Sequence, residues 1–445
     1  MDLSALRLHR LSADFCWLLA EKVVLLGVKL AFSALCALWL GKTQFGEFNY
    51  LLSFVFFSTT LYALGIGRIL VRELNAQPQH TSEILVSSFW ARLAFSCCLW
   101  CLSLPLLFYF SQSSLQAWLI ALLLLGNISY AANVYEFWFQ LKGRNSVLVK
   151  FRLFGACCFV LVKLLLLWQW PVLQYLVFVH ALELVVMNFG YYWLFRRYAG
   201  EELSSYQLSL SWRWFDWSLL KPIMQQSGYL LLSSIAVMLY LRIDLVMLQH
   251  MLGSDAVADY SVAVQFSEIW YSIPTIVFIV MAPGLLRLHQ QQPELYYQKM
   301  QSVMNGLFIG SVCFSALILL VAAFLLPLLF GKEFHLALDI LRWHIWAGVL
   351  VALREGLSQW LVAERFAQFS LFSHLGGAVV NLLLNFWLIP LYGAIGAAWA
   401  TGFAYLFSTF ICLLFLQRTR PLALMMLKAV CSPVTYFIAL MKGRV

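Results

Sequence analysis

The sequence predicts an all-α membrane protein that lies almost wholly within the bilayer. Of its residues, 63% are hydrophobic and only 11% are charged, whereas soluble globular proteins average about 25% charged residues. The apolar runs are continuous and reach the roughly 20 residues that a helix needs to cross the hydrocarbon core. A helix also satisfies its own backbone hydrogen bonds in lipid. Strands of a transmembrane barrel would instead alternate apolar and polar residues over about ten positions.

The apolar runs predict twelve membrane spans. In chain order they cover residues 14–40, 46–70, 84–110, 116–141, 148–169, 172–196, 222–250, 257–285, 303–329, 337–361, 368–390 and 392–416. The first run follows Arg7 and Arg10, as in a signal peptide. However, Glu21, Lys22 and Lys29 interrupt it and no small-residue cleavage site follows, so we expect an uncleaved first span.

Basic residues between the expected spans fall mainly on one side of the membrane. With twelve spans, both termini lie on the same side of the membrane. The basic residues expected on that side are Arg7, Arg10, Arg72, Lys142, Arg144, Arg196, Arg197, Arg213, Lys221, Arg287, Lys299, Arg365, Arg418, Arg420, Lys428, Lys442 and Arg444. The opposite side carries only Lys42 and Lys332. Because cytoplasmic loops are enriched in Lys and Arg, we expect both termini in the cytoplasm.

The net charge has the same explanation. It amounts to 29 − 20 = +9, which in a soluble protein would suggest nucleic acid. No base-stacking or groove-reading module is visible, and membrane topology accounts for the basic residues. No nucleic-acid partner is therefore expected.

A polar stretch in the middle of the chain divides the spans into two groups of six. The expected parts are an N-terminal six-helix lobe over 1–197, a cytoplasmic linker over 198–221, a C-terminal six-helix lobe over 222–417 and a tail over 418–445. The tail is apolar from Pro421 to Met441, but Lys428 and Pro433 interrupt it. We therefore expect the tail at the cytoplasmic membrane interface.

The two halves share a short pattern at a constant offset of 252 − 40 = 212 residues. The matched positions are Leu40, Gly41, Glu47, Phe48 and Phe54 in the first half and Leu252, Gly253, Asp259, Tyr260 and Phe266 in the second. This match predicts a duplicated six-helix unit. Because six is even, both copies share one orientation, related by a pseudo-two-fold axis along the membrane normal. Some transporters use this arrangement, with a substrate path between the lobes.

Motifs for nucleotide, metal or covalent chemistry are missing. Gly41-Lys42-Thr43 resembles the end of a phosphate-binding loop, but Cys36 stands where that loop needs its first glycine. Cys98 and Cys101 form a C-x-x-C without a partner pair or a nearby histidine. No catalytic motif is found, and the expected outward loops are short. We therefore expect no cofactor, no metal and no enzyme activity.

Ionisable residues inside the spans are the most informative feature. A charge there costs at least about 2.5 kcal/mol, so it should face a protein interior or a water-filled cavity. Such cations are Lys22, Lys29, Lys163, Arg242 and Arg354, and such acids are Glu183, Asp244 and Glu268. The cations either line a cavity or form ion pairs between helices. The acids either pair with them, or carry protons or coordinate sodium.

Uncharged polar stripes accompany these charges. Asn133, Glu136 and Gln140 share one face of the fourth span, as do His374, Asn381 and Asn385 in the eleventh. They either hydrogen-bond between helices or line a polar cavity.

Several stretches resemble a known family. They are residues 381–401 from Asn381 through Pro390 and Gly393 to Thr401, Arg242-Ile-Asp244, Leu252-Gly253, Tyr260-Ser261, Gly41, Phe45-Gly46 and Gly65-Ile-Gly67. Together they resemble the Wzx-type O-antigen and polysaccharide flippases of the multidrug/oligosaccharidyl-lipid/polysaccharide exporter superfamily. The resemblance covers essentially the whole chain, and its motifs do not distinguish one sugar from another.

The resemblance implies a function. Such proteins move an undecaprenyl-pyrophosphate-linked oligosaccharide from the cytoplasmic to the periplasmic leaflet of the bacterial inner membrane, by alternating access. It also implies a polysaccharide polymerase and a chain-length regulator as partners, and H⁺ or Na⁺ as the coupling ion. Lys29, Lys163, Arg242 and Arg354, with Lys22, would then bind the anionic pyrophosphate or acidic sugars.

Two other functions compete with this interpretation. An ion-coupled multidrug exporter would share the two six-helix lobes, but its cavity would favour cations and so be rich in acidic residues. Here the deep Lys and Arg residues are at least as numerous as Asp and Glu. A membrane polysaccharide polymerase or ligase is disfavoured by the short outward loops and by the internal repeat.

Overall fold

The computed structural model describes residues 24–200, 210–364, 366 and 368–441. These residues form helices joined by short connections, and none of them forms a strand. The predicted all-α class is therefore confirmed. The chain divides into two compact units, Met1–Ile235 and Ala236–Val445, and the division falls inside helix α9 (Trp217–Met251). The expected lobe and linker boundaries remain predictions.

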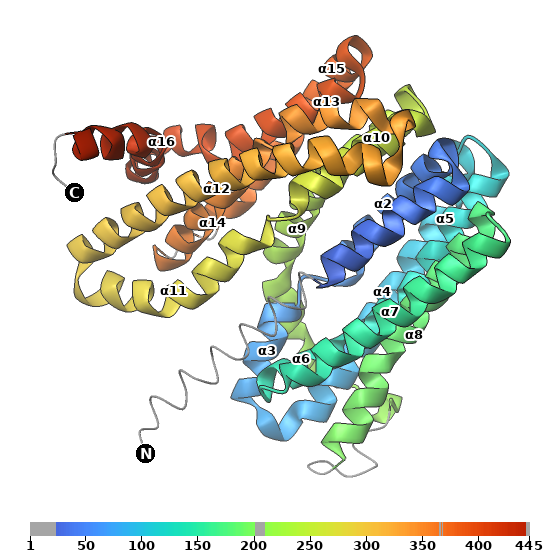
Figure 1. Ribbon diagram of the computed structural model, residues 1–445. Coiled ribbons are helices and arrows are strands. Elements are labelled where there is room, and N and C mark those ends of the chain that lie inside the picture. Colours follow the sequence, from blue (N-terminus) through green and yellow to red (C-terminus); the bar gives the residue numbers. More distant parts are fainter. Residues whose placement is uncertain (1–23, 201–209, 365, 367, 442–445) are drawn as a thin grey trace. The chain divides into compact units, whose positions relative to one another are not determined.

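The first unit begins with a helix over Val24–Leu40. It continues with α2 (Lys42–Tyr62), α3 (Gly67–Ala76), η1 (Pro78–His80), α4 (Thr81–Phe110), α5 (Ser114–Asn127), η2 (Ile128–Tyr135), α6 (Glu136–Leu141), α7 (Asn145–Gln169), α8 (Leu173–Ala199), η3 (Trp212–Trp214) and the first part of α9 (Figure 1). Helix α8 packs against α5, α7 and η2, and α4 also packs against η2. An aromatic core that includes Phe89, Tyr135, Trp138 and Phe195 fills the space between these elements.

The described residues of the second unit form the rest of α9 and seven further α-helices. They are α10 (Ser254–Glu268), α11 (Ser272–Gln291), α12 (Pro293–Phe330), α13 (His335–His344), α14 (Ala347–Ala363), α15 (Gln368–Thr409) and α16 (Arg420–Met441), with the short turns η4 (Lys332–Phe334) and η5 (Ile411–Leu414). Helix α12 packs against α11, α14 and α16, while α15 packs against α13 and α14. The expected interfacial tail is thus helical, and its first part packs on α12.

Local sequence explains where several helices begin. Ser113 accepts a hydrogen bond from the backbone of Gln116 and so caps α5. Asp216 precedes α9 and accepts from the backbone and the hydroxyl of Ser218, and these bonds hold the pKa of its carboxyl below its usual value. Gly41 and Gly253 precede α2 and α10 with φ of 77° and 89°, a conformation that favours glycine. These two glycines are the pair found at the offset of 212.

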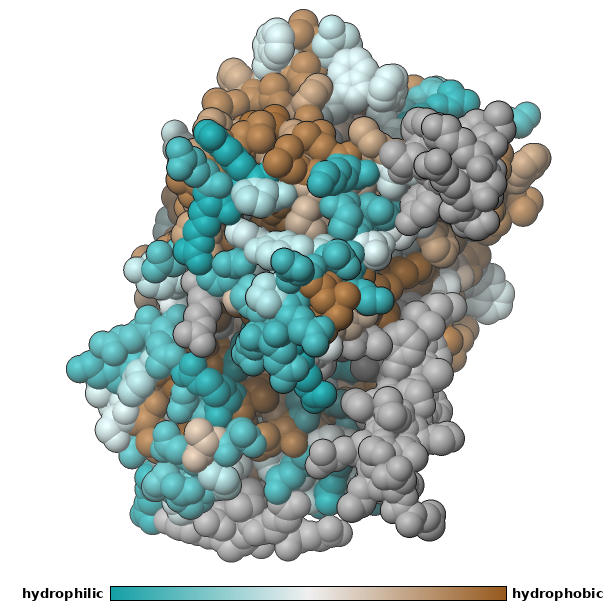
Figure 2. All heavy atoms as spheres, turned by 90° about the vertical axis from the view of Figure 1, so that its left-hand side faces the viewer, coloured by the Kyte–Doolittle hydropathy of each residue, from teal (hydrophilic) through white to brown (hydrophobic). Residues whose placement is uncertain are grey.

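The outer surfaces are those of a multi-pass membrane protein. Large apolar side chains such as Phe154, Trp168, Phe324 and Leu328 are between 69% and 82% exposed. On the face drawn in Figure 2, hydrophobic residues gather toward the top and hydrophilic residues toward the middle and the lower part. Exposed apolar surface of this extent is typical of contact with lipid or with another protein.

Helix length and hydropathy give fewer spans than the twelve predicted. By length and hydropathy, eight helical segments of the described chain are able to cross a membrane, or nine if the bent pair Lys332–His344 and Ala347–Ala363 counts as one span. The segment Gln368–Leu414 counts once although it covers two expected spans, and Gly393 interrupts it with φ of 63°. Val24–Leu40 counts only as a shorter apolar helix. Twelve spans and two-lobe symmetry therefore remain predictions.

Candidate functional site

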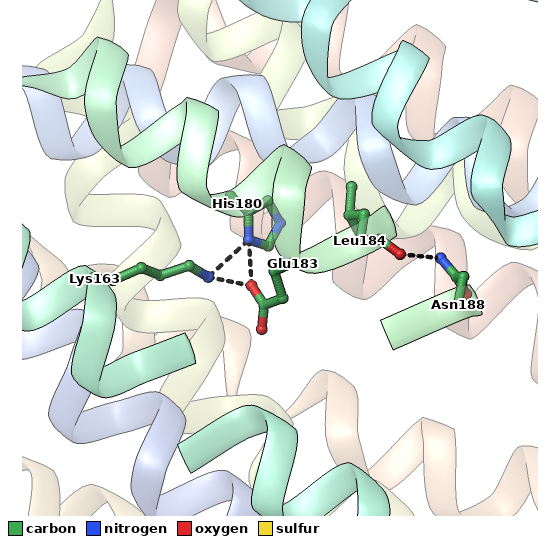
Figure 3. A network of polar contacts seen from close by, with 5 residues as sticks. All are labelled: Lys163, His180, Glu183, Leu184 and Asn188. Atoms are coloured by element: carbon green, nitrogen blue, oxygen red, sulfur yellow. Dashed lines mark hydrogen bonds and ion pairs between the residues drawn. The ribbon is translucent and has the colours of Figure 1, made fainter. Parts of the chain in front are cut away.

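Three ionisable side chains meet between α7 and α8 of the first unit (Figure 3). Lys163 lies on α7, and its ammonium contacts the Glu183 carboxylate on α8 in a close ion pair. It also lies 2.8 Å from Nδ1 of His180, which is itself 2.9 Å from Oε2 of Glu183. The Lys163 side chain is only 5% exposed. The structure thus joins a predicted substrate-binding cation and a predicted ion-coupling acid in one cluster.

The position of His180 makes the proton arrangement of this cluster interdependent. Nδ1 of a histidine either donates a hydrogen bond or accepts one. Here it faces a donor, the Lys163 ammonium, and an acceptor, the Glu183 carboxylate. With a proton on Nδ1, His180 donates to Glu183 but cannot accept from the Lys163 ammonium. Without that proton, it accepts from Lys163 but cannot donate to Glu183. The cluster is therefore able to respond to a proton or to an incoming anion.

The polar stripe of the fourth span forms a second cluster in the same unit. The Glu136 carboxylate accepts hydrogen bonds from Asn133 at 2.8 Å and from Gln140 at 3.1 Å. It also forms an ion pair of 3.1 Å with Arg152 of α7. The polar residues of this stripe therefore surround the Glu136 carboxylate, which is joined to α7 by its ion pair with Arg152.

In the second unit, Asp244 of α9 is enclosed by hydroxyls and amides and is 1% exposed. Tyr260, Thr401 and Asn385 each donate to its carboxylate at 2.5 Å. The Asn385 amide nitrogen also donates to Oδ1 of Asn381 at 3.0 Å, and Oδ1 of Asn385 has no hydrogen-bond partner among the described residues. The result is a buried carboxylate that accepts hydrogen bonds from two hydroxyls and one amide nitrogen.

The break in α15 helps to bring together the residues around Asp244. Gly393 has non-helical dihedral angles, so α15 consists of two helical segments on either side of it. Asn381 and Asn385 lie on the first segment and Thr401 on the second, yet Asn381 and Thr401 are within 3.4 Å of each other. The break therefore brings residues 20 positions apart to the same carboxylate.

Two further cations of the second unit have polar partners. Arg242 of α9 forms an ion pair of 3.0 Å with Glu268 at the end of α10, and both side chains are at most 20% exposed. Arg354 of α14 is 6% exposed. Its guanidinium donates to the Ser408 carbonyl, to the Ser373 hydroxyl at 2.8 Å and to Nε2 of His374 at 2.8 Å.

The bond to Arg354 fixes the role of His374. Arginine only donates, so Nε2 of His374 accepts and Nδ1 carries the hydrogen. Nδ1 lies 2.9 Å from the Tyr240 hydroxyl, which completes a polar chain across α14, α15 and α9. Arg354 is therefore held by neutral groups, in contrast to Lys163 and Arg242, which face carboxylates.

The remaining predicted cations lie elsewhere. Lys29 is exposed on the helix Val24–Leu40, and Lys22 lies outside the described residues. Lys29 and Lys163 belong to the first unit, whereas Arg242 and Arg354 belong to the second. A single cavity that contains all of them stays a prediction. Among the described residues, no group of three or more His, Cys, Asp or Glu side chains is placed to hold a metal ion.

Sequence reasoning missed several members of these clusters. Tyr260 and Thr401 were singled out only within motifs, because uncharged hydroxyls carry no signal of burial beside an acid. Arg92 of α4 belongs to none of these clusters and is not among the predicted cations, although a cation eight residues inside the expected span 84–110 is itself a signal. The structure shows that it is 1% exposed.

Comparison with known proteins gives the family and the fold. Residues 11–289, well over half of the chain, match the model of a family described as polysaccharide biosynthesis protein. Among curated proteins, none matches the chain.

Solved structures of transporters share the fold. An inward-facing multidrug resistance MATE family transporter of the MOP superfamily aligns with a TM-score of 0.70 at 14% identity, covering 90% of this chain and 98% of that one. The lipid II flippase MurJ aligns with a TM-score of 0.70 at 12% identity, covering 95% and 92%. A MOP superfamily transporter from Pyrococcus furiosus aligns with a TM-score of 0.60 at 13% identity, covering 94% and 95%.

Proposed function

The chain belongs to the polysaccharide biosynthesis protein family, and we propose that it is a Wzx-type flippase for a lipid-linked oligosaccharide. Its cargo would be an undecaprenyl-pyrophosphate-linked O-antigen repeat or a related surface polysaccharide unit. Alternating access would carry this cargo from the cytoplasmic to the periplasmic leaflet of the bacterial inner membrane. A polymerase and a chain-length regulator would then act on the product. The family match is the observation that carries this proposal.

The buried cations support an anionic cargo. Lys163 and Arg354 are at most 6% exposed, and a buried cation is costly unless charge or hydrogen bonding compensates it. A pyrophosphate or an acidic sugar is able to replace Glu183 beside Lys163, or to accept from Arg354. In this proposal the internal partners hold the cations in place until the cargo arrives.

The Asp244 cluster supports coupling to an ion gradient. A buried carboxylate is suited either to a proton or to a small cation, since hard cations prefer oxygen ligands, and the hydroxyl oxygens of Tyr260 and Thr401 lie beside it. The unpartnered Oδ1 of Asn385 adds an oxygen that a cation would use. Glu183 and Glu268 are alternative coupling acids, but each already faces a cation.

A second candidate is an ion-coupled multidrug exporter. The multidrug transporter and the flippase align with the same TM-score of 0.70, so fold similarity does not separate the two functions. The chemistry of the cargo separates them, because an exporter of cationic drugs needs acidic groups that the protein itself does not neutralise. Among the described residues, Glu183 and Glu268 pair with Lys163 and Arg242, whereas the buried Arg354 has only neutral partners and keeps its positive charge for an anion.

Deleting the gene tests the two functions against each other. A flippase deletion should leave lipid-linked oligosaccharide on the cytoplasmic leaflet and reduce surface polysaccharide, and a plasmid copy should restore both. Intact surface polysaccharide together with altered drug tolerance would reject the flippase and support the exporter. Drug tolerance should be measured in the same strains as the control.

A further inference from the structure

Arg92 is a buried cation for whose guanidinium the described part of the chain supplies no hydrogen bond. It lies on α4, is 1% exposed, and its Nε and Nη1 atoms are buried without a partner. Its guanidinium instead lies over two aromatic rings, 5.5 Å from the centroid of Tyr130 and 5.8 Å from that of Phe137. Buried polar groups are otherwise almost always satisfied, so this arginine needs an explanation.

The nearest acid does not provide one. Glu136 is close enough to act on Arg92 electrostatically. However, its two oxygens already accept from Asn133, Gln140 and Arg152. Among the described residues, no acid forms a hydrogen bond or an ion pair with Arg92. Its charge is therefore suited to a further anionic group.

We propose that Arg92 binds an anionic oxygen group of the transported lipid, its pyrophosphate, at a site between α4, η2 and α6. This inference rests on the proposed flippase function and adds a residue to it. A guanidinium binds phosphate oxygens through its N–H donors, and the Nε and Nη1 atoms that lack partners each offer one. The rings of Tyr130 and Phe137 stabilise the cation while the site is empty.

The local backbone is suited to open this site. Tyr130 belongs to η2, a 3₁₀ helix of eight residues, although such helices rarely exceed three or four residues. A 3₁₀ stretch inside a longer helical segment often marks a hinge. We infer that movement of η2 withdraws the Tyr130 ring and admits the anion to Arg92.

The test measures thermal unfolding of the full-length purified protein with and without inorganic pyrophosphate. The wild type should unfold at a higher temperature as pyrophosphate is added. Arg92→Met should be at least as stable as the wild type without pyrophosphate, because an unpaired buried charge is removed, and should lose the response. Arg92→Lys keeps the charge but not the fixed planar set of donors, so its pyrophosphate affinity should fall at least about tenfold.

Arg342→Met is the matched control, since Arg342 is exposed and pairs with Asp339. This variant should keep the full pyrophosphate response. If Arg92→Met unfolds at a lower temperature while Arg92→Lys keeps wild-type affinity, Arg92 is a structural residue and the site is rejected. The site is also rejected if pyrophosphate leaves the wild type unchanged.

Two lipid probes separate the possible sources of the anion. Undecaprenyl pyrophosphate should compete with inorganic pyrophosphate, whereas phosphatidylglycerol vesicles should not. Competition by phosphatidylglycerol alone would assign the site to a membrane headgroup and overturn the proposal. A failure of the proposed flippase function would give a different result. The Arg92-dependent response to pyrophosphate would persist, but deletion of the gene would leave surface polysaccharide intact.

Discussion

At the scale of single residues, the buried cations fall into two kinds. Lys163 and Arg242 face carboxylates, while Arg354 is held by neutral acceptors. Removing one partner of a buried pair leaves a charge uncompensated, whereas replacing both partners is often tolerated. Comparing single with double replacements of a pair therefore distinguishes a structural ion pair from a binding site.

The pair of Lys163 and Glu183 gives the first prediction. Glu183→Gln and Lys163→Met should each destabilise the protein by about 3–5 kcal/mol, because each leaves one charge unpaired in the interior. The double variant Lys163→Met/Glu183→Leu should recover most of that loss in thermal unfolding. If it also recovers transport, Lys163 is structural only and the proposed cation site at this position fails.

Asp244 gives the second prediction. If sodium binds in its cluster, sodium should stabilise the wild type against thermal unfolding by about 2.7 kcal/mol at a concentration about 100 times Kd. Asp244→Asn should abolish this stabilisation because the ligand loses its charge. The matched control is Asp255→Asn, since Asp255 is exposed at the start of α10. Equal sodium stabilisation of Asp244→Asn and wild type would contradict the assignment.

At the scale of elements, breaks in helices position the polar clusters. Tyr130 and Asn133 lie on the 3₁₀ segment η2, which interrupts the helical path from α5 to α6. The Gly393 break separates the two parts of α15 that meet at Asp244. Regular helices would carry these side chains along one axis and keep them apart.

Close packing after the α15 break gives the third prediction. A Cβ at Gly396 would lie 2.3 Å from the Leu388 carbonyl oxygen, whereas a Cβ at Gly402 would have no atom within 4 Å. Gly396→Ala should therefore destabilise the protein by at least about 1–3 kcal/mol, as overpacking does. Gly402→Ala should be neutral or stabilising by up to about 1 kcal/mol. Thermal unfolding of both variants measures the difference. Equal unfolding temperatures for Gly396→Ala and Gly402→Ala would contradict the close packing at Gly396.

At the scale of the whole molecule, the path of the chain through the membrane decides its orientation. The chain is a multi-pass membrane protein, while helix length alone gives eight or nine spans in the described residues. The distribution of basic residues predicts twelve spans and two cytoplasmic termini. Lys142 and Lys332 are both exposed and are expected on opposite sides, so they provide a direct test.

Cysteine labelling gives the fourth prediction. In a background whose ten cysteines are replaced, Lys332→Cys should react with a membrane-impermeant maleimide added to intact cells. Lys142→Cys should react only after the membrane is permeabilised. Labelling of both from outside would contradict the predicted topology, and with it the direction of transport.

The sequence by itself determined the properties that follow from composition and periodicity. Long apolar runs can satisfy their backbone in lipid only as helices, so the all-α membrane class was predictable. The charges at Lys163, Glu183, Arg242, Asp244, Glu268 and Arg354 were identifiable because any charge inside an apolar run is exceptional.

Only the tertiary structure decided which of these charges meet. Lys163 and Glu183 lie on different helices, and Asp244 meets Asn385 and Thr401 only because α15 breaks at Gly393. Hydroxyl groups such as that of Tyr260 have no signature in sequence, because their role depends on the acid they face. The unpartnered state of Arg92 was also invisible, since the absence of a hydrogen bond belongs to packing in three dimensions and not to residue order.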